Sequence, residues 1–113
     1  MKELTNLFKI LSDETRLRII LLLSEGQLCV CQICGILELS QPKASKHLAK
    51  MRDLGFVDVE KKEQFVYYSL NLESKMVSKI IQVLEANALE IEQFKIDREK
   101  LNIKENILNK CEI

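Results

Sequence analysis

The sequence predicts a mainly α-helical domain with one small β-hairpin. Hydrophobic residues make up 47% of the 113 positions, and glycine and proline together occupy only four, so few positions interrupt helices. Over most of the chain, apolar residues recur at spacings of three and four, which is typical of amphipathic helices. Residues 56–70 instead alternate between apolar and polar, which is typical of strands. These observations favour one helical domain that carries a single hairpin.

Two helices are predicted before residue 24. Four apolar residues follow the i, i+3, i+4, i+7 spacing of a first helix that ends near Ser12: Leu4, Leu7, Phe8 and Leu11. Asp13 is suited to cap the second helix, and Glu14 is favourable in its first turn. Apolar residues fill most of positions 17–23 and leave little polar surface. We therefore expect the second helix at the centre of the core.

Two shorter helices follow, separated by a tight turn. The third is expected to begin within residues 28–34 and to run to about Glu38, with Gly26 placed to end the helix before it. Residues 39–42 form the turn, and Pro42 fits the first turn of a fourth helix, where its missing N–H costs little. One face of that helix is apolar and comprises Ala44, Leu48 and Met51.

The opposite face of the fourth helix is basic. It carries Lys43, Lys46 and Lys50, and His47 lies at its border. Two short helices joined by a tight turn, the second with a basic outer face, match the helix-turn-helix arrangement, whose second helix enters the major groove of DNA. A lysine face on its own is also ordinary for any solvated helix. The hairpin that follows strengthens the prediction of DNA binding.

Residues 56–59 and 65–70 are predicted to form the two strands of this hairpin, around a charged tip at residues 60–64. A hairpin in this position is a wing, so the predicted fold is a winged helix-turn-helix. Lys61 and Lys62 at the tip are placed to reach a phosphate backbone. The alternation directs three side chains to the core, Val66, Tyr68 and Leu70, and two to the other side, Phe65 and Tyr67.

From Glu73 the helical period returns, with a seam of apolar residues at spacings of three and four. Such a seam on a long helix at the end of a small domain predicts packing on a partner helix, with the first helix as its neighbour. We expect a homodimer through the first and last helices, formed by Leu4, Leu7, Phe8, Val77, Ile81, Leu84, Ala88 and Ile91. Residues 1–92 would form this DNA-binding and dimerisation domain, and residues 93–113 a C-terminal helical extension or a partly disordered tail.

Charge and motif content narrow the possible functions. The net charge is zero, but residues 40–71 hold six basic and four acidic side chains, so a polyanion should meet the middle of the chain. The longest aliphatic run, Ile19–Leu23, is too short to span a bilayer, and we expect a cytoplasmic protein without a membrane partner. His47 is the only histidine, and no catalytic constellation surrounds it. We expect neither enzymatic activity nor an organic cofactor.

Three of the four cysteines lie within six residues, as Cys29, Cys31 and Cys34. In a reducing compartment such spacing indicates metal ligands or redox thiols, and thiolates select thiophilic ions. On an ideal helix Cys31 and Cys34 lie roughly 60° apart, while Cys29 falls nearly opposite. Binding through three sulfurs therefore requires Cys29 to fold back from the preceding loop, or the first helical turn to distort. The alternative is that all three are small buried hydrophobic residues.

Three segments together resemble the ArsR/SmtB family of metal-responsive winged-helix repressors. They are Ser12–Ile19, Leu28–Cys31 and Ser40–Leu48, and the resemblance covers about residues 2–92. It implies a dimeric repressor that stays on a palindromic double-stranded DNA operator until an ion binds. The cysteine run resembles the site of the family's arsenical-resistance repressors, which implies As(III) or Sb(III) as the inducer, bound by Cys29, Cys31 and Cys34.

Departures from other branches of the family point to the same inducer. Residues 73–99 contain no histidine, whereas the zinc-sensing branch uses aspartate and histidine ligands on its last helix. No cysteine precedes Cys29, whereas cadmium and lead sensors add cysteines near the N-terminus. Two further differences lie outside the thiol run, by which we mean residues 29–34. Glu14 stands where members often have proline, and the wing tip lacks the glycine commonly found there.

The DNA contacts can be divided by side-chain chemistry. We expect Gln41, Ser45, Lys46 and His47 to face bases, and Lys43, Lys50, Lys61 and Lys62 to contact phosphates as flexible point charges. Three alternatives stay open. The first two are repressors of the same fold that respond to thiol oxidation or to another thiophilic metal such as Cd, Pb or Zn. The third is a zinc-stabilised protein-interaction module.

Overall fold

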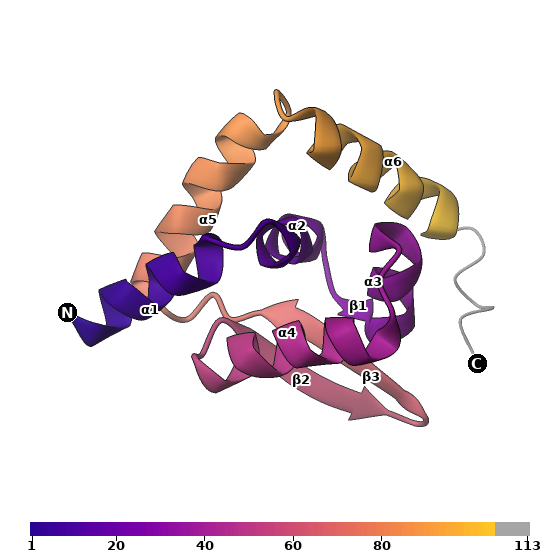
Figure 1. Cartoon of the computed structure of the whole chain (residues 1–113), viewed down its shortest axis with the longest axis horizontal. Coiled ribbons are helices and arrows are strands. Elements are labelled where there is room, and N and C mark those ends of the chain that lie inside the picture. The colour runs from indigo at the N-terminus through magenta and orange to yellow at the C-terminus, as the bar shows by residue number, and fades with distance from the viewer. Residues whose placement is uncertain (106–113) are drawn as a thin grey trace.

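In the computed structural model, residues 1–105 form six helices and a three-stranded sheet (Figure 1). Cys111 and the other residues from 106 to 113 lie outside the described part of the chain. No helix within residues 1–105 is both long and apolar enough to cross a membrane. The elements in chain order are α1 (Lys2–Leu11), α2 (Glu14–Leu23), β1 (Leu28–Cys29), α3 (Val30–Leu37), α4 (Gln41–Asp53), β2 (Val57–Lys62), β3 (Phe65–Leu70), α5 (Lys75–Ala88) and α6 (Glu92–Glu105).

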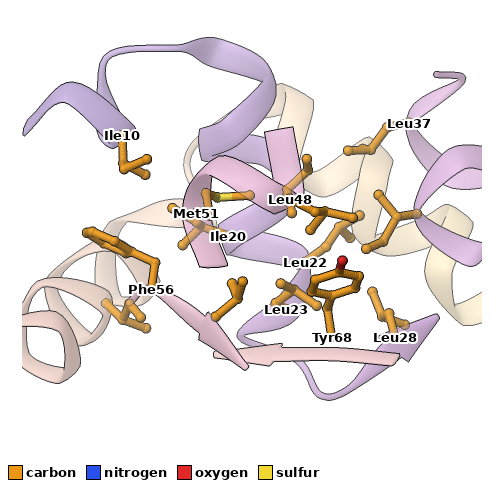
Figure 2. Packing of buried hydrophobic residues seen from close by; sticks show 14 of the residues in the cluster. Ile10, Ile20, Leu22, Leu23, Leu28, Leu37, Leu48, Met51, Phe56 and Tyr68 are labelled. Carbon is orange, nitrogen blue, oxygen red and sulfur yellow. The ribbon is translucent and has the colours of Figure 1, made fainter. Parts of the chain in front are cut away.

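Helix α2 forms the centre of the fold, as the sequence predicts. The Asp13 carboxylate caps it by accepting a hydrogen bond from the backbone N–H of Arg16 at 3.0 Å. Residues 19–23 are all buried, and Figure 1 shows α2 nearly end-on with the other helices around it. In Figure 2, Ile20, Leu22 and Leu23 meet side chains of α4 and of the sheet. The core therefore extends around every side of this one helix.

Helices α3 and α4 form the predicted helix-turn-helix. Helix α3 ends at Leu37, and its C-cap residue, Glu38, has a φ of 57°, which places it in the left-handed region and turns the chain toward α4. Ser40 then caps α4, because its hydroxyl accepts from the backbone N–H of Lys43 at 3.4 Å. The predicted apolar face of α4 is confirmed, since its three members are fully buried: Ala44, Leu48 and Met51.

The predicted wing is present as the β2–β3 hairpin. Its antiparallel register runs from Val57 opposite Leu70 to Lys62 opposite Phe65. Glu63 takes a φ of 57° in the two-residue turn, a conformation that glycine adopts with less strain. The predicted alternation is also confirmed. Tyr68 is buried and Val66 and Leu70 pack on the core, whereas the rings of Phe65 and Tyr67 pack on each other with centroids 6.3 Å apart.

A third strand, β1, was not expected. It pairs antiparallel with β3, which gives the strand order β1–β3–β2. At two residues it is too short to show any alternation in the sequence, and it exists because β3 offers it a free edge. Its consequence is functional, because its second residue is Cys29.

The residues of the predicted dimer seam divide into two groups by their burial within the single chain. Leu7, Val77, Ile81 and Ala88 are at most 7% exposed, and they pack within the core of a single chain. Their helical period correctly marks a buried face but does not say which surface buries it. The other proposed members differ, because Leu4, Phe8 and Ile91 are 38%, 60% and 44% exposed. Leu84 is half-buried, beside Leu21 and Phe94.

Residues 92–105 form a separate helix, α6, whereas the sequence left a helical extension or a partly disordered tail open. It packs on α2 and α3 and buries Phe94 and Leu101. Its Asp97 is 1% exposed and forms a two-pronged ion pair with Arg18 of α2, with Nε–Oδ2 and Nη2–Oδ1 distances of 2.9 Å. Gln93 donates a further hydrogen bond to Oδ1 at 3.1 Å. The carboxylate is therefore fully paired despite its burial.

We predict that Arg18→Ala lowers the free energy of unfolding by about 3 kcal/mol, because it leaves the buried Asp97 carboxylate without its partner. Asp97→Ala should cost less, since the Arg18 side chain keeps 23% exposure and can reach water. Urea denaturation measures both. Arg98→Ala is the control, because its ion pair with Glu25 is far more exposed and should contribute under about 1 kcal/mol. Equal losses for Arg18→Ala and Arg98→Ala would contradict the assigned role of the buried pair.

Candidate nucleic-acid interface and thiol site

Cys29 lies just before helix α3 and not within it. It ends β1 and is also the N-cap residue of α3, with extended backbone angles of −86° and 161°. Its Sγ lies 2.9 Å from the Sγ of Cys31, which is the second residue of the helix. The expected return of Cys29 from the preceding segment is therefore built into the fold. The pair in close contact is Cys29 and Cys31, whereas the helix geometry favoured Cys31 and Cys34.

Gln32 holds Cys29 in this conformation. Its side-chain Oε1 accepts a hydrogen bond from the backbone N–H of Cys29 at 2.8 Å, and its own backbone N–H points to the Cys29 sulfur. This reciprocal arrangement is a capping box. The half that involves sulfur is the weaker one, because a thiol is a poor acceptor. This role of Gln32 was not predicted from the sequence, although a glutamine three residues after an N-cap is its usual signal.

Cys34 lies one helical turn beyond Cys31 and is half-buried. Burial raises the pKa of its thiol above the ordinary range, and the nearby Cys29 raises it further. Within residues 1–105, no three cysteine, histidine or acidic side chains are arranged to hold a metal ion. Cys31 is disulfide-bonded in this structure, so a site of three thiolates also requires reduction of that bond. The three sulfurs are neighbours along the chain but are not assembled into a site.

Backbone pairing connects the thiol run to the wing. Leu28 and Cys29 of β1 lie opposite Tyr68 and Tyr67 of β3. Strand β3 continues to the tip of the hairpin, where it pairs with Lys61 and Lys62. A displacement of Cys29 therefore acts directly on a strand of the wing.

The predicted DNA-contacting residues of α4 are accessible to a partner. Gln41, Lys43, Lys46 and Lys50 are exposed, and Ser45 and His47 are half-buried. Helix α4 packs beside β2, so the helix and the wing belong to one side of the molecule (Figure 1). Lys61 and Lys62 are exposed near the tip of the hairpin. The Lys62 Nζ lies 5.5 Å from the centroid of the Tyr67 ring and 3.8 Å from a Glu60 carboxylate oxygen.

His47 is fixed by Arg16, which was not predicted to be a functional residue. Arg16 donates from Nε to the carbonyl of Ile10 and from Nη2 to that of Lys9, which satisfies the end of α1. Its Nη1 lies 3.4 Å from His47 Nδ1. Because a guanidinium only donates, Nδ1 is the acceptor there and Nε2 carries the proton. Burial lowers the pKa of His47, so the ring is neutral at pH 7 and suits hydrogen bonding better than charge pairing.

The helix-turn-helix of α3 and α4 together with the β2–β3 wing defines a winged helix-turn-helix protein. The chain belongs to the arsR family of bacterial regulatory proteins, whose family model matches residues 13–59. The arsenic resistance transcriptional regulator ArsR2 of Pseudomonas putida KT2440 is 46% identical over 86 residues, which cover 74% of this chain and 75% of that protein.

Two further comparisons agree with this family. The arsenical resistance operon repressor of Escherichia coli K12 is 56% identical over 66 residues, which cover 58% of this chain and 56% of that protein. This chain therefore spans little more than half the length of the E. coli relative. The structure of HlyU from Vibrio cholerae superposes with a TM-score of 0.70 at 35% identity and covers 75% of this chain and 90% of that one.

Proposed function

We propose that this protein is a DNA-binding transcriptional repressor of an arsenic-resistance operon, released from its operator when As(III) or Sb(III) binds Cys29, Cys31 and Cys34. One observation carries the proposal. The three cysteines occupy the start of α3, and α3 is joined by the three residues 38–40 to α4, which bears the basic face. A ligand at the first helix of a helix-turn-helix thus acts next to the helix that would read DNA.

The chemistry of the thiol run suits a trivalent metalloid. Arsenite is As(OH)₃ in neutral water, and three thiols replace its three hydroxides, forming three As–S bonds and releasing three waters. No electrons are transferred, so the reaction needs no oxidant or reductant once the cysteines are reduced. Soft sulfur ligands favour such a centre over hard ions such as Mg²⁺ and Ca²⁺. The raised pKa of Cys34 keeps it a thiol before binding. When its sulfur replaces a hydroxide of As(OH)₃, the thiol proton leaves with that hydroxide as water.

Binding would change the DNA-reading surface because the three sulfurs must first converge. Cys34 sits on the regular part of α3 and Cys29 on β1, so a shared metalloid draws the helix and the strand together. The α3 side acts on α4 through the left-handed turn at Glu38, and the β1 side acts on the wing through Tyr67. Release follows to the extent that the metalloid prefers the distorted conformation.

The proposed DNA contacts follow exposure and side-chain chemistry. On α4, Gln41, Ser45, Lys46 and His47 would face base edges in the major groove, and Lys43 and Lys50 would contact phosphates. The wing lysines, Lys61 and Lys62, would contact the phosphates beside the groove. Phosphate contacts provide affinity in all sequences, whereas the base contacts select the operator.

We further propose that two copies pair through the exposed face of α1, with Leu4 and Phe8, and the adjoining part of α5. Phe8 is 60% exposed on a helix whose opposite face is buried, and a symmetric dimer buries the same patch twice. A dimer also presents two reading helices to a palindromic operator.

A redox-responsive repressor, in which two of the clustered thiols oxidise to a disulfide, is the second candidate, because the sulfurs of Cys29 and Cys31 lie only 2.9 Å apart. The two candidates differ in what removes the protein from DNA. An oxidant without arsenite should release a redox sensor, whereas arsenite with the protein kept reduced should release a metalloid sensor.

We predict that Cys31→Ser and Cys34→Ser each bind operator DNA normally but fail to leave it at arsenite concentrations that release the parent protein. A serine hydroxyl keeps the shape of the side chain but is a hard, weakly binding ligand, so at most two thiolates remain. Fluorescence anisotropy with DNA from upstream of the gene, at a stated salt concentration and with a phosphine reductant, measures release.

Cys111→Ser is the matched control for these variants, since this cysteine lies outside the thiol run and outside the described residues. It should respond to arsenite as the parent does. Release of Cys34→Ser at the parental arsenite concentration would refute the three-cysteine site.

We predict that Lys50→Ala and Lys61→Ala weaken operator binding by lost counterion release. Each lost phosphate contact should lower the slope of log affinity against log salt by about one unit per protomer. Lys95→Ala on α6 is the control, because that lysine is exposed but lies away from α4 and the wing. A slope that is the same for all three variants would contradict the assigned DNA-binding face.

We predict that Phe8→Glu converts the dimer to a monomer, because it places a charge in each half of an apolar interface, where it would be buried unpaired. Sedimentation equilibrium measures the change. Ile103→Glu is the control, since Ile103 is similarly exposed, at 59%, but lies on α6. A dimer that survives Phe8→Glu would exclude α1 from the interface.

A further inference from the structure

Gln32 is an unusual residue for its position in the protein. Among residues 1–103 it is one of two polar or charged residues that are buried, at 5% exposure, and the other is the ion-paired Asp97. A buried carboxamide destabilises a protein unless it forms hydrogen bonds. The partner of its oxygen is the backbone N–H of Cys29, at 2.8 Å. Gln32 lies between Cys31 and Cys34 in the sequence, and this contact joins it to Cys29.

Cys29 is the cysteine that most needs to be held. Cys31 and Cys34 are carried by the regular hydrogen bonds of α3, whereas Cys29 precedes the helix and has extended backbone angles. The contact from Gln32 fixes this N-cap conformation, in which residue Cys29 is 3% exposed and its sulfur lies 2.9 Å from the Cys31 sulfur. Without it, rotation about the backbone at Cys29 would carry the sulfur away from its neighbour.

We propose that Gln32 is a positioning residue of the thiol site, which holds Cys29 beside Cys31 so that only Cys34 has to be recruited by the incoming metalloid. The inference rests on the proposed function of the three cysteines. Gln32 contributes no ligand atom of its own. It raises the fraction of molecules in which two of the three sulfurs are already together, and the apparent affinity rises in proportion to that fraction.

The test compares arsenite binding by the full chain and its variants, kept reduced by a phosphine because thiol reductants would compete for arsenite. Gln32→Met keeps the length of the side chain and removes the acceptor oxygen. Its dissociation constant for arsenite should rise about tenfold, the effect expected from losing one typical hydrogen bond. Gln32→Glu retains an acceptor and is the other standard capping-box residue, so it should restore most of the lost affinity. Gln82→Met, at an exposed position of α5, should bind as the parent does.

A second measurement separates positioning from a general effect on the helix. Phenylarsine oxide bonds two thiols, and in a Cys29→Ser background it reports on Cys31 and Cys34 alone. If Gln32 acts through Cys29, adding Gln32→Met to that background should leave phenylarsine oxide binding unchanged. Equal weakening there would show that Gln32 supports α3 as a whole, which overturns the inference.

The outcomes for arsenite also distinguish the inference from the function on which it rests. A parent protein that binds arsenite through three thiols, with Gln32→Met binding it equally tightly, overturns the role of Gln32 and leaves the proposed function standing. A parent protein that does not bind arsenite overturns both. Circular dichroism confirms that each variant is folded at the temperature of the binding measurement.

Discussion

Burial of α2 on all sides is the constraint on which the rest of the structure depends. Five consecutive residues, Ile19 to Leu23, point in every direction around the helix axis, and each is at most 5% exposed. A single neighbouring helix can cover only one face, so α2 has to be surrounded. Helices α1, α3, α5 and α6 and strand β3 all contact it. The order of the elements along the chain then decides which neighbour covers which side.

This central packing restrains the helix that carries the thiols. Three residues of α3 face inward, Ile33, Ile36 and Leu37, and they anchor it in the same core as α2. Close-packed side chains move between discrete arrangements and resist continuous deformation. A ligand that draws the start of α3 toward β1 therefore has to displace the elements beside it, which are α4 and the wing. The core thus provides the rigidity that a sensor of this kind needs.

Helix α6 adds an electrostatic restraint to the same region. Its Lys100 pairs with Glu38 at 2.8 Å, at the turn between α3 and α4. That pair is exposed and contributes little to stability, and it holds the pKa of Glu38 below its ordinary value. The buried pair of Asp97 with Arg18 anchors α6 on α2 far more firmly. Helix α6 therefore contacts both α2 and the turn between α3 and α4. A movement of Glu38 would have to break its ion pair with Lys100 of α6.

Local patterns in the sequence were enough to locate most elements. The cap at Asp13, the proline near the start of α4 and the alternation of residues 65–70 each specify a local structure, because capping, a fixed φ and strand period act between near neighbours. The basic face of α4 followed from helical period in the same way. The clustering of Cys29, Cys31 and Cys34 was visible as spacing alone.

Only the tertiary structure decided what each buried face packs against. Helical period marks Val77 and Ile81 as buried, but it cannot distinguish the chain's own core from a partner, because both surfaces are apolar. The pairing of β1 with β3 depends on a free strand edge some 40 residues away, and the role of Gln32 depends on the conformation of Cys29. The pairing of Arg18 with Asp97 joins residues 79 positions apart. Such contacts form only when distant segments meet, so residue type and spacing do not reveal them.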